Sequence, residues 1–392
     1  MWLHVLALIA LLGLVFLGLE ILHAFYRGVI EAQHEDVLRD TEASKSEGDR
    51  KRLVWLLYQL LRSLVNVPIM AGVKVSLILH ESLHAIVHAA MGGRPRIVLC
   101  PNGGYAPLEP WVGGIGWLPI ALTRPALGGV ACLAPVLGGS LLYLSLLLWL
   151  TPADFSYLTA ASPPIVDACA PAKLGDLPGA LLRGLRTLLD PARRAGVLGT
   201  VALLVAVILT APSLTPSSTD FVLARRHLVG HSIAAVLAAL AFEAIPRAAP
   251  WLLILVGAAG FVLYFLSRKI GRDWPDYPGI VGMTLLLLGI LAKTGALGSL
   301  PARGIASGIA VVIEVLLFTG SILLAFLLLI VLLNLVGLQF DAIGLMLRKA
   351  PGELKDVFTR FHTCTKCNLH FHGKCDGCGR TPEELRAVGE GG

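Results

Sequence analysis

Apolar runs, separated by short stretches of proline, glycine or charged residues, repeat along almost the whole chain. A helix needs about 20 apolar residues to cross the hydrocarbon core of a bilayer, and these runs are close to that length. The pattern therefore predicts about eight or nine membrane-spanning helices. The expected spans are residues 2–26, 53–67, 69–92, 125–150, 195–212, 222–245, 250–267, 279–300 and 307–338.

The first span is expected to be a retained membrane anchor and not a cleaved signal peptide. Small residues mark the cleavage site of a secretory signal, whereas His23, Phe25 and Arg27 follow the apolar run here. Residues 1–30 are therefore expected to form an N-terminal transmembrane anchor.

The composition excludes a water-soluble globular protein. Of the 392 residues, 56% are hydrophobic and 15% are charged, and the mean hydropathy is +0.76. The formal net charge of +6 comes mostly from Lys and Arg at span ends and in the tail, where positive charge marks the cytoplasmic side. Nucleic-acid binding is not expected. Arginine pairs at 193–194 and 225–226 flank a single apolar run, which leaves the topology between residues 150 and 230 open.

The distribution of charge divides the rest of the chain into three parts. Residues 31–52 carry many acidic and basic side chains and are expected to form a charged cytosolic loop, either a solvated helical extension or a linker. Residues 53–345 are expected to form the membrane core, and residues 346–392 a cytosolic tail.

An HExxH motif, residues 80–84, lies in the middle of the apolar run 73–91. In a helix, residues i and i+4 share one face, so His80 and His84 can direct imidazole nitrogens to one zinc ion. Glu81 then lies beside the metal, where it can act as general base on a zinc-bound water.

The position of this motif in lipid strengthens the functional interpretation. Ionisable side chains in hydrocarbon cost several kcal/mol unless they are paired or bound to metal. The alternative is a structural cluster of polar residues between helices, or a water-lined pathway. His88 lies about 12 Å along the helix axis from His80, too far to share one ion with both motif histidines, so it is expected to pack or to support a ligand.

The third zinc ligand must come from outside the motif, because catalytic zinc usually has three protein ligands and an open fourth position. Asp341 follows the last long apolar run, where Gly337 could loosen the helix and direct the carboxylate inward. The alternatives are Glu243 and Glu314, which lie within apolar runs, and Asp220, which opens one.

The motif and the segment after it resemble the site-2 protease family of intramembrane zinc metalloproteases. Residues 80–85 match the family's HExxHA helix. A strand-like stretch, 95–100, follows and ends in Asn102, Gly103 and Gly104. The family has a comparable β segment that presents substrate as an added strand, so the resemblance implies a substrate-binding role for these three residues.

Two later segments extend the resemblance, which covers about residues 70–345. Residues 131–139, rich in Ala, Pro and Gly, lie where the family has a helix of small residues. Residues 334–344 are similar to the family's NxxPxxPLDG segment, whose Asp is the third zinc ligand, and this implies that role for Asp341. The prolines of that segment are absent here, and the spacing from Asn334 to Asp341 is one residue shorter.

A second histidine pair with i,i+4 spacing, His227 and His231, follows two arginines. Two helical pairs could together hold a haem or a dinuclear metal centre, as in membrane electron-transfer proteins or hydroxylases. Such sites rarely need a glutamate like Glu81, and no further histidine cluster completes a dinuclear set. These two histidines are therefore expected to lie at the membrane interface or to line the active-site cavity.

The tail contains two CxxC pairs separated by seven residues. The four cysteines are Cys364, Cys367, Cys375 and Cys378. Each pair can turn both thiolates towards one ion, and two pairs give a closed Cys₄ zinc site that folds a segment too short for its own core. A small structural zinc ribbon is expected at about residues 362–380. Two disulfides are the alternative, which a reducing cytoplasm disfavours.

The expected fold class is an all-α polytopic membrane protein with a short β segment after the zinc helix and a small, cytoplasmic C-terminal zinc ribbon. The expected function is an intramembrane zinc metalloendopeptidase that cleaves transmembrane or membrane-adjacent segments of other proteins with a zinc-activated water. Its partners would be a membrane-protein substrate and the lipid bilayer; no oligomeric state is predicted. The alternative is a non-proteolytic membrane protein that uses its histidine pairs for a structural, transport or redox metal or haem site.

Metal analysis of the purified chain distinguishes these two functions. We expect about two zinc ions per chain, one catalytic and one structural, falling to about one in the double variant His80→Ala, His84→Ala, because the ribbon keeps its own ion. A haem absorbance band, or iron in place of the membrane-site zinc, would favour the non-proteolytic alternative.

Overall fold

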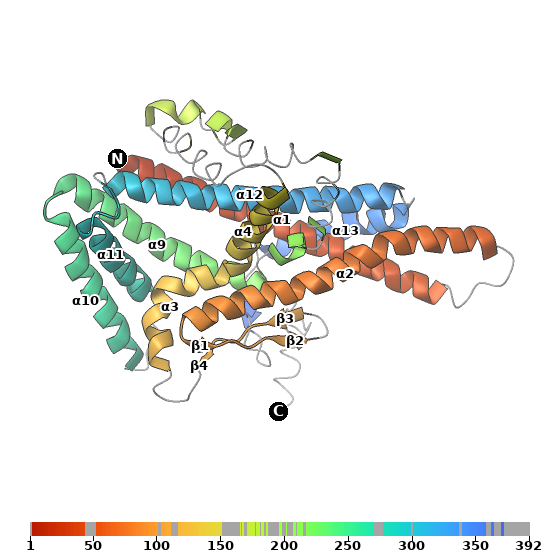
Figure 1. Cartoon of the computed structure of the whole chain (residues 1–392), viewed down its shortest axis with the longest axis horizontal. Coiled ribbons are helices and arrows are strands. Elements are labelled where there is room, and N and C mark those ends of the chain that lie inside the picture. Colours follow the sequence, from red (N-terminus) through yellow and green to blue (C-terminus); the bar gives the residue numbers. More distant parts are fainter. Residues whose placement is uncertain are drawn as a thin grey trace.

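The apolar runs of the chain fold into long helices that lie against one another, as the computed structural model in Figure 1 shows. The structure describes residues 2–43, 52–100, 103–110, 117–150, 217–269, 277–298, 301–336 and 339–357, short stretches between 165 and 214, and the pairs 362–363 and 370–371.

Helices dominate the described part of the chain. Their bounds are α1 (Trp2–Ala43), α2 (Arg52–Ala90), α3 (Trp117–Cys132), α4 (Ala134–Leu150), α9 (Ser218–Ala244), α10 (Ala249–Lys269), α11 (Tyr277–Lys293), α12 (Pro301–Val336) and α13 (Phe340–Val357), with the 3₁₀ segments η3 (Pro171–Asp176) and η4 (Ala211–Leu214). In Figure 1, α10 and α11 pack side by side at one end, while α1 runs along α12.

Five of the helices in the described residues are long and apolar enough to cross a membrane. They cover Trp2–Asp36, Ile69–Ala90, Asp220–Ala244, Ala249–Ser267 and Pro301–Val336. A sixth span is possible if α3 and α4, which are bent by 56° at Leu133, count as one broken crossing. The structure is therefore an all-α assembly of membrane-spanning character.

This number is lower than the eight or nine spans expected from the apolar runs. Runs 53–67 and 69–92 are parts of one continuous helix, α2. Run 279–300 gives only the short apolar helix α11. Run 195–212 falls mostly outside the described residues.

The charged segment 31–52 begins as a direct continuation of α1, which extends to Ala43. It also has a partner in the tail, since Lys349 on α13 lies 2.6 Å from Glu35 and 3.9 Å from Glu31. The first part of the expected loop is thus a helical extension against which α13 packs.

Short strands follow α2 and lie along it (Figure 1). Strands β2 (Val98–Cys100) and β3 (Gly103–Tyr105) form one antiparallel pair, in which Gly104 faces Leu99. Strands β1 (Gly93–Arg94) and β4 (Glu109–Pro110) form the other. Contacts of β1 and β3 with α2 place this β segment beside the helix that carries the HExxH motif.

The tail contributes one further antiparallel pair, β5 (His362–Thr363) with β6 (His370–Phe371). Strand β6 contacts α9. The remaining tail residues with an expected role lie outside the described part of the chain, so the zinc ribbon stays a prediction. They are the four cysteines Cys364, Cys367, Cys375 and Cys378. Asn102, expected to bind substrate, also lies outside the described residues.

Helix α1 is fixed against α9 by contacts at successive turns. Arg225 on α9 donates to the buried carboxylate of Glu20 on α1. Phe221 packs against Phe16 and His23, with ring centroids 5.4 Å apart in both pairs. An ion pair and two ring contacts over about two turns of α1 therefore set the position of this helix relative to the first turns of α9.

Candidate metal centre

The HExxH motif lies on α2, within the membrane-spanning part of that helix. Its two histidines are one helical turn apart and are buried, His80 being 7% and His84 6% exposed. Their Nε2 atoms are 3.1 Å apart. The i,i+4 spacing thus produces the convergence of imidazoles that the sequence predicts.

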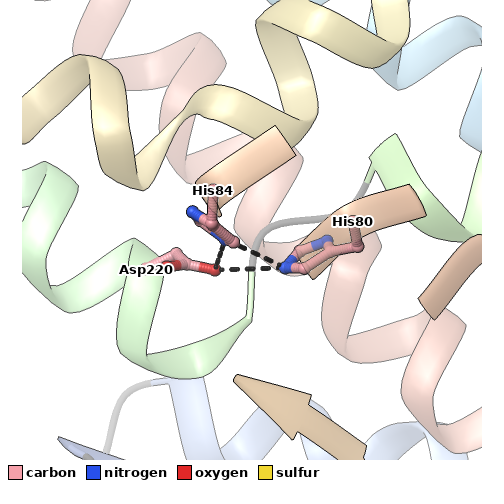
Figure 2. Close-up of side chains that lie close together, drawn as sticks. All are labelled: His80, His84 and Asp220. Atoms are coloured by element: carbon pink, nitrogen blue, oxygen red, sulfur yellow. Dashed lines mark hydrogen bonds and ion pairs between the residues drawn. The ribbon is translucent and has the colours of Figure 1, made fainter. Parts of the chain in front are cut away.

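The third member of the group is Asp220, in the first turn of α9 (Figure 2). Its Oδ2 atom lies 3.2 Å from Nε2 of His84 and 3.5 Å from Nε2 of His80. All three side chains are buried, and their ligand atoms lie within 4.8 Å of one another. One acid from a distant helix therefore completes a set of three possible ligands.

The dimensions of this triangle fit a tetrahedral zinc ion. Zinc–nitrogen and zinc–oxygen bonds of about 2.0–2.2 Å place neighbouring ligand atoms about 3.3–3.5 Å apart on the edges of a tetrahedron. The observed separations are 3.1, 3.2 and 3.5 Å. Three protein ligands would occupy one face and leave the fourth position open, as in catalytic sites.

Backbone carbonyls orient both imidazoles. Nδ1 of His80 donates to the carbonyl of Ser213 at 3.2 Å, and Nδ1 of His84 donates to the carbonyl of Ala131 at 2.8 Å. A proton on each Nδ1 leaves a lone pair on each Nε2. In neutral imidazoles two lone pairs and a carboxylate oxygen can then be directed at one metal ion.

A proline makes the second of these carbonyls available. Pro135 has no N–H, so it cannot bond the carbonyl four positions earlier, which belongs to Ala131. That carbonyl lies at the bend between α3 and α4 and accepts from His84 instead. The break in this span therefore supplies the partner that fixes the tautomer of His84.

Asp220 is held in place by a capping box at the start of α9. The Ser217 hydroxyl accepts from the backbone N–H of Asp220 at 3.2 Å, while the Asp220 carboxylate accepts from the N–H of Ser217 at 2.8 Å. The Ser217 hydroxyl also donates to Oδ2 at 2.8 Å. Such caps define where a helix begins, and here the cap also directs the carboxylate to the histidines.

Two glycines of α4 allow the surrounding elements to approach closely. A Cβ on Gly138 would lie 2.6 Å from a methyl carbon of Leu83, inside the HExxH motif. A Cβ on Gly139 would overlap a methyl carbon of Leu214, which follows Ser213. These small residues thus allow α4 to pack against α2, which carries His80, and against η4, whose Ser213 carbonyl orients the His80 ring.

Glu81 is also buried, at 4% exposure, and follows His80 on α2. Its carboxylate lies within electrostatic range of His84. A buried carboxylate next to a set of three metal ligands is in the position expected of a general base.

Asp341, the ligand implied by the resemblance, is not part of this group. It lies exposed in the first turn of α13, a helix that packs along α1. Among the alternatives, Glu243 is exposed near the end of α9, and Glu314 is buried on α12 outside the group. Asp220 is the candidate that the structure brings to the histidines.

The other histidines lie around the group without joining it. His88 stacks on His84, with ring centroids 6.2 Å apart. His227 packs where a Cβ on Gly128 would lie 2.5 Å from its ring, and His231 hydrogen-bonds Thr284 at 2.7 Å. These contacts give all three histidines structural surroundings of their own.

Comparison of the chain with protein-family models, with curated proteins and with solved structures gives no match.

Replacing each candidate third ligand tests the geometry directly. Loss of a hydrogen bond to a metal ligand lowers metal affinity about 10–100-fold. Asp220→Ala removes a ligand itself, so it should weaken zinc binding at the membrane site by more than that. Asp341→Ala is the matched control and should keep the zinc content of the unaltered chain. Zinc per chain at a buffered free-zinc concentration is the measurement; the opposite order of the two variants would contradict the assignment.

Pro135→Ala tests the role of the broken span. The new N–H can bond the Ala131 carbonyl and compete with Nδ1 of His84, so zinc affinity should fall by about 10–100-fold. Pro125→Ala, in the same bent pair of helices, is the control, because the carbonyl four positions before Pro125 is not one of the two that orient the imidazoles. Competition with a chelator measures both affinities, and equal values for the two variants would exclude the proposed role.

Proposed function

We propose that this chain is an intramembrane zinc metalloendopeptidase. The observation that carries the proposal is the buried triangle of His80, His84 and Asp220, with Glu81 adjacent, inside a membrane-spanning helix bundle. Ionisable side chains are costly in hydrocarbon unless they are paired or bind an ion, so they usually mark a functional site. Three nitrogen and oxygen ligands with an open position are typical of hydrolytic zinc and not of structural zinc, which has four protein ligands.

A zinc ion in this site would supply a Lewis acid and an acidified water. His80, His84 and Asp220 would hold it, and the carbonyls of Ser213 and Ala131 would keep both Nε2 atoms available. Glu81 would accept the proton of the attacking water and return it to the departing amine. The apolar helices around the group would restrict water to the reacting position.

The substrate we propose is a transmembrane or membrane-adjacent segment of another protein. A peptide bond within a helix is shielded, so the segment must first unwind into an extended strand. Strands β2 and β3 lie beside α2, and the side chain of Leu99 on β2 is exposed. An unwound segment could add to this pair through main-chain hydrogen bonds, in the region of Asn102, Gly103 and Gly104 for which the resemblance implies substrate binding.

We propose a second, structural zinc ion in the Cys₄ ribbon of the tail, on the cytoplasmic side. Its ligands would be Cys364, Cys367, Cys375 and Cys378. The described strand β6 contacts α9, the helix that carries Asp220. This contact supports a role for the tail as a docking module next to the catalytic part.

Glu81→Gln is the experiment that tests the activity. The variant should keep zinc, since the glutamate is not a ligand, but should lose at least about 100-fold in cleavage, because it cannot accept the proton. The measurement is accumulation of uncleaved membrane proteins in cells, by quantitative mass spectrometry of the membrane fraction.

Ser82→Ala provides the matched control at the next position. The Ser82 hydroxyl donates to the carbonyl of Ile78 in its own helix, at 2.7 Å, so its loss should leave cleavage unchanged. Full zinc in Glu81→Gln with unaltered processing of every membrane protein would refute the protease.

A further inference from the structure

A buried histidine outside the motif packs against Phe221, the residue that follows Asp220. His23, on α1, is 8% exposed. Neither of its ring nitrogens has a hydrogen-bond partner among the described residues. It lies within range of an electrostatic interaction with both His80 and Asp220. Helix α1 therefore brings a polar side chain to the first turn of α9, beside the residue that follows Asp220.

The position of His23 is set by the same contacts that fix α1 against α9. Its ring packs on Phe221, the residue directly after Asp220, and Tyr26 lies one turn further along α1 with its ring centroid 6.1 Å away. Three residues earlier on α1, Glu20 pairs with Arg225. His23 is thus positioned relative to the Asp220 ligand by direct packing and not by a flexible segment.

Packing alone does not account for a histidine here. A buried donor or acceptor without a partner costs about 1–3 kcal/mol, and leucine or phenylalanine would fill the space beside Phe221 without that cost. A buried histidine with this cost is expected where its ring nitrogen hydrogen-bonds a group of a bound molecule.

His23 is not a fourth metal ligand in this arrangement. The compact set of ligand atoms within 4.8 Å contains His80, His84 and Asp220 and does not include His23. A side chain that lies near the ligands, but outside their triangle, is suited to bond an oxygen atom held at the centre.

We propose that His23 is a substrate-binding residue that donates a ring N–H to the oxygen of the peptide carbonyl under attack. A neutral imidazole always carries one N–H, so the role needs no change of protonation. A fixed donor aimed at an oxygen that gains negative charge is among the strongest contributions to hydrolysis, worth about 10²–10³-fold in rate. This inference rests on the proposed function, whose motif does not include His23.

The test is oxyanion binding to the metal-loaded protein, which needs no substrate. Cobalt(II) replaces zinc in the detergent-solubilised full chain, and inorganic phosphate is titrated while the visible cobalt spectrum is followed. In His23→Leu, which has similar volume and no N–H, phosphate should bind about 10–100-fold more weakly, while cobalt affinity stays unchanged. This range is that of a hydrogen bond to a charged group.

Further variants separate hydrogen bonding from packing. His23→Gln keeps an N–H donor and should recover part of the phosphate affinity. His23→Phe is a second variant without a donor, suited to a position that already contacts Phe221 and Tyr26. His231→Leu, on α9 and bonded to Thr284, is the control and should bind phosphate like the unaltered chain.

Unchanged phosphate affinity in His23→Leu or His23→Phe would overturn the proposal. Loss of cobalt from both variants would overturn it as well, because His23 would then belong to the structure that holds the metal. Phosphate binding remains measurable if the chain cleaves no peptide, so failure of the protease and failure of this role give different results. If the chain does cleave peptides, His23→Leu should lower kcat more than it raises KM.

Discussion

The structure depends most on one buried polar group, in which the Nε2 atoms of His80 and His84 lie 3.1 Å apart and 3.5 and 3.2 Å from a carboxylate oxygen of Asp220. In an apolar bundle such side chains are costly unless they pair with one another or bind a cation. The elements around the group hold it together. The break between α3 and α4 and the 3₁₀ segment η4 supply the carbonyls that orient the imidazoles, and the cap of α9 supplies the acid.

The histidine pair could be predicted from sequence because its geometry is local. Residues 80 and 84 lie on one helix, and the helical repeat alone brings their nitrogens together. Asp220 could not be predicted in the same way, since its distance from the motif depends on how α9 packs against α2. The available signal was Ser217 three residues before Asp220, a capping box at the start of an apolar run. Resemblance favoured Asp341 instead, because it compares segments in order along the chain and not in space.

The broad fold was predictable for a similar reason. Apolar length indicates which segments are helical and long enough for a bilayer, but it cannot tell where two runs fuse into one helix, as in α2, or where one run bends, as at Leu133. Pro135 shows how a local signal can acquire a distant consequence. The sequence alone shows that Pro135 has no N–H and leaves the Ala131 carbonyl unbonded. Only the fold shows that His84 donates to this carbonyl.

The separation of the ligands along the chain affects how the protein is made. His84 and Asp220 are 136 positions apart, and at about 5–20 residues per second the ribosome adds the second roughly 7–27 s after the first. During that interval the nascent chain carries the HExxH helix without its carboxylate partner. Biosynthesis therefore yields the histidine pair first, and the group that could hold a metal ion is complete only after the start of α9 has been translated and has reached α2.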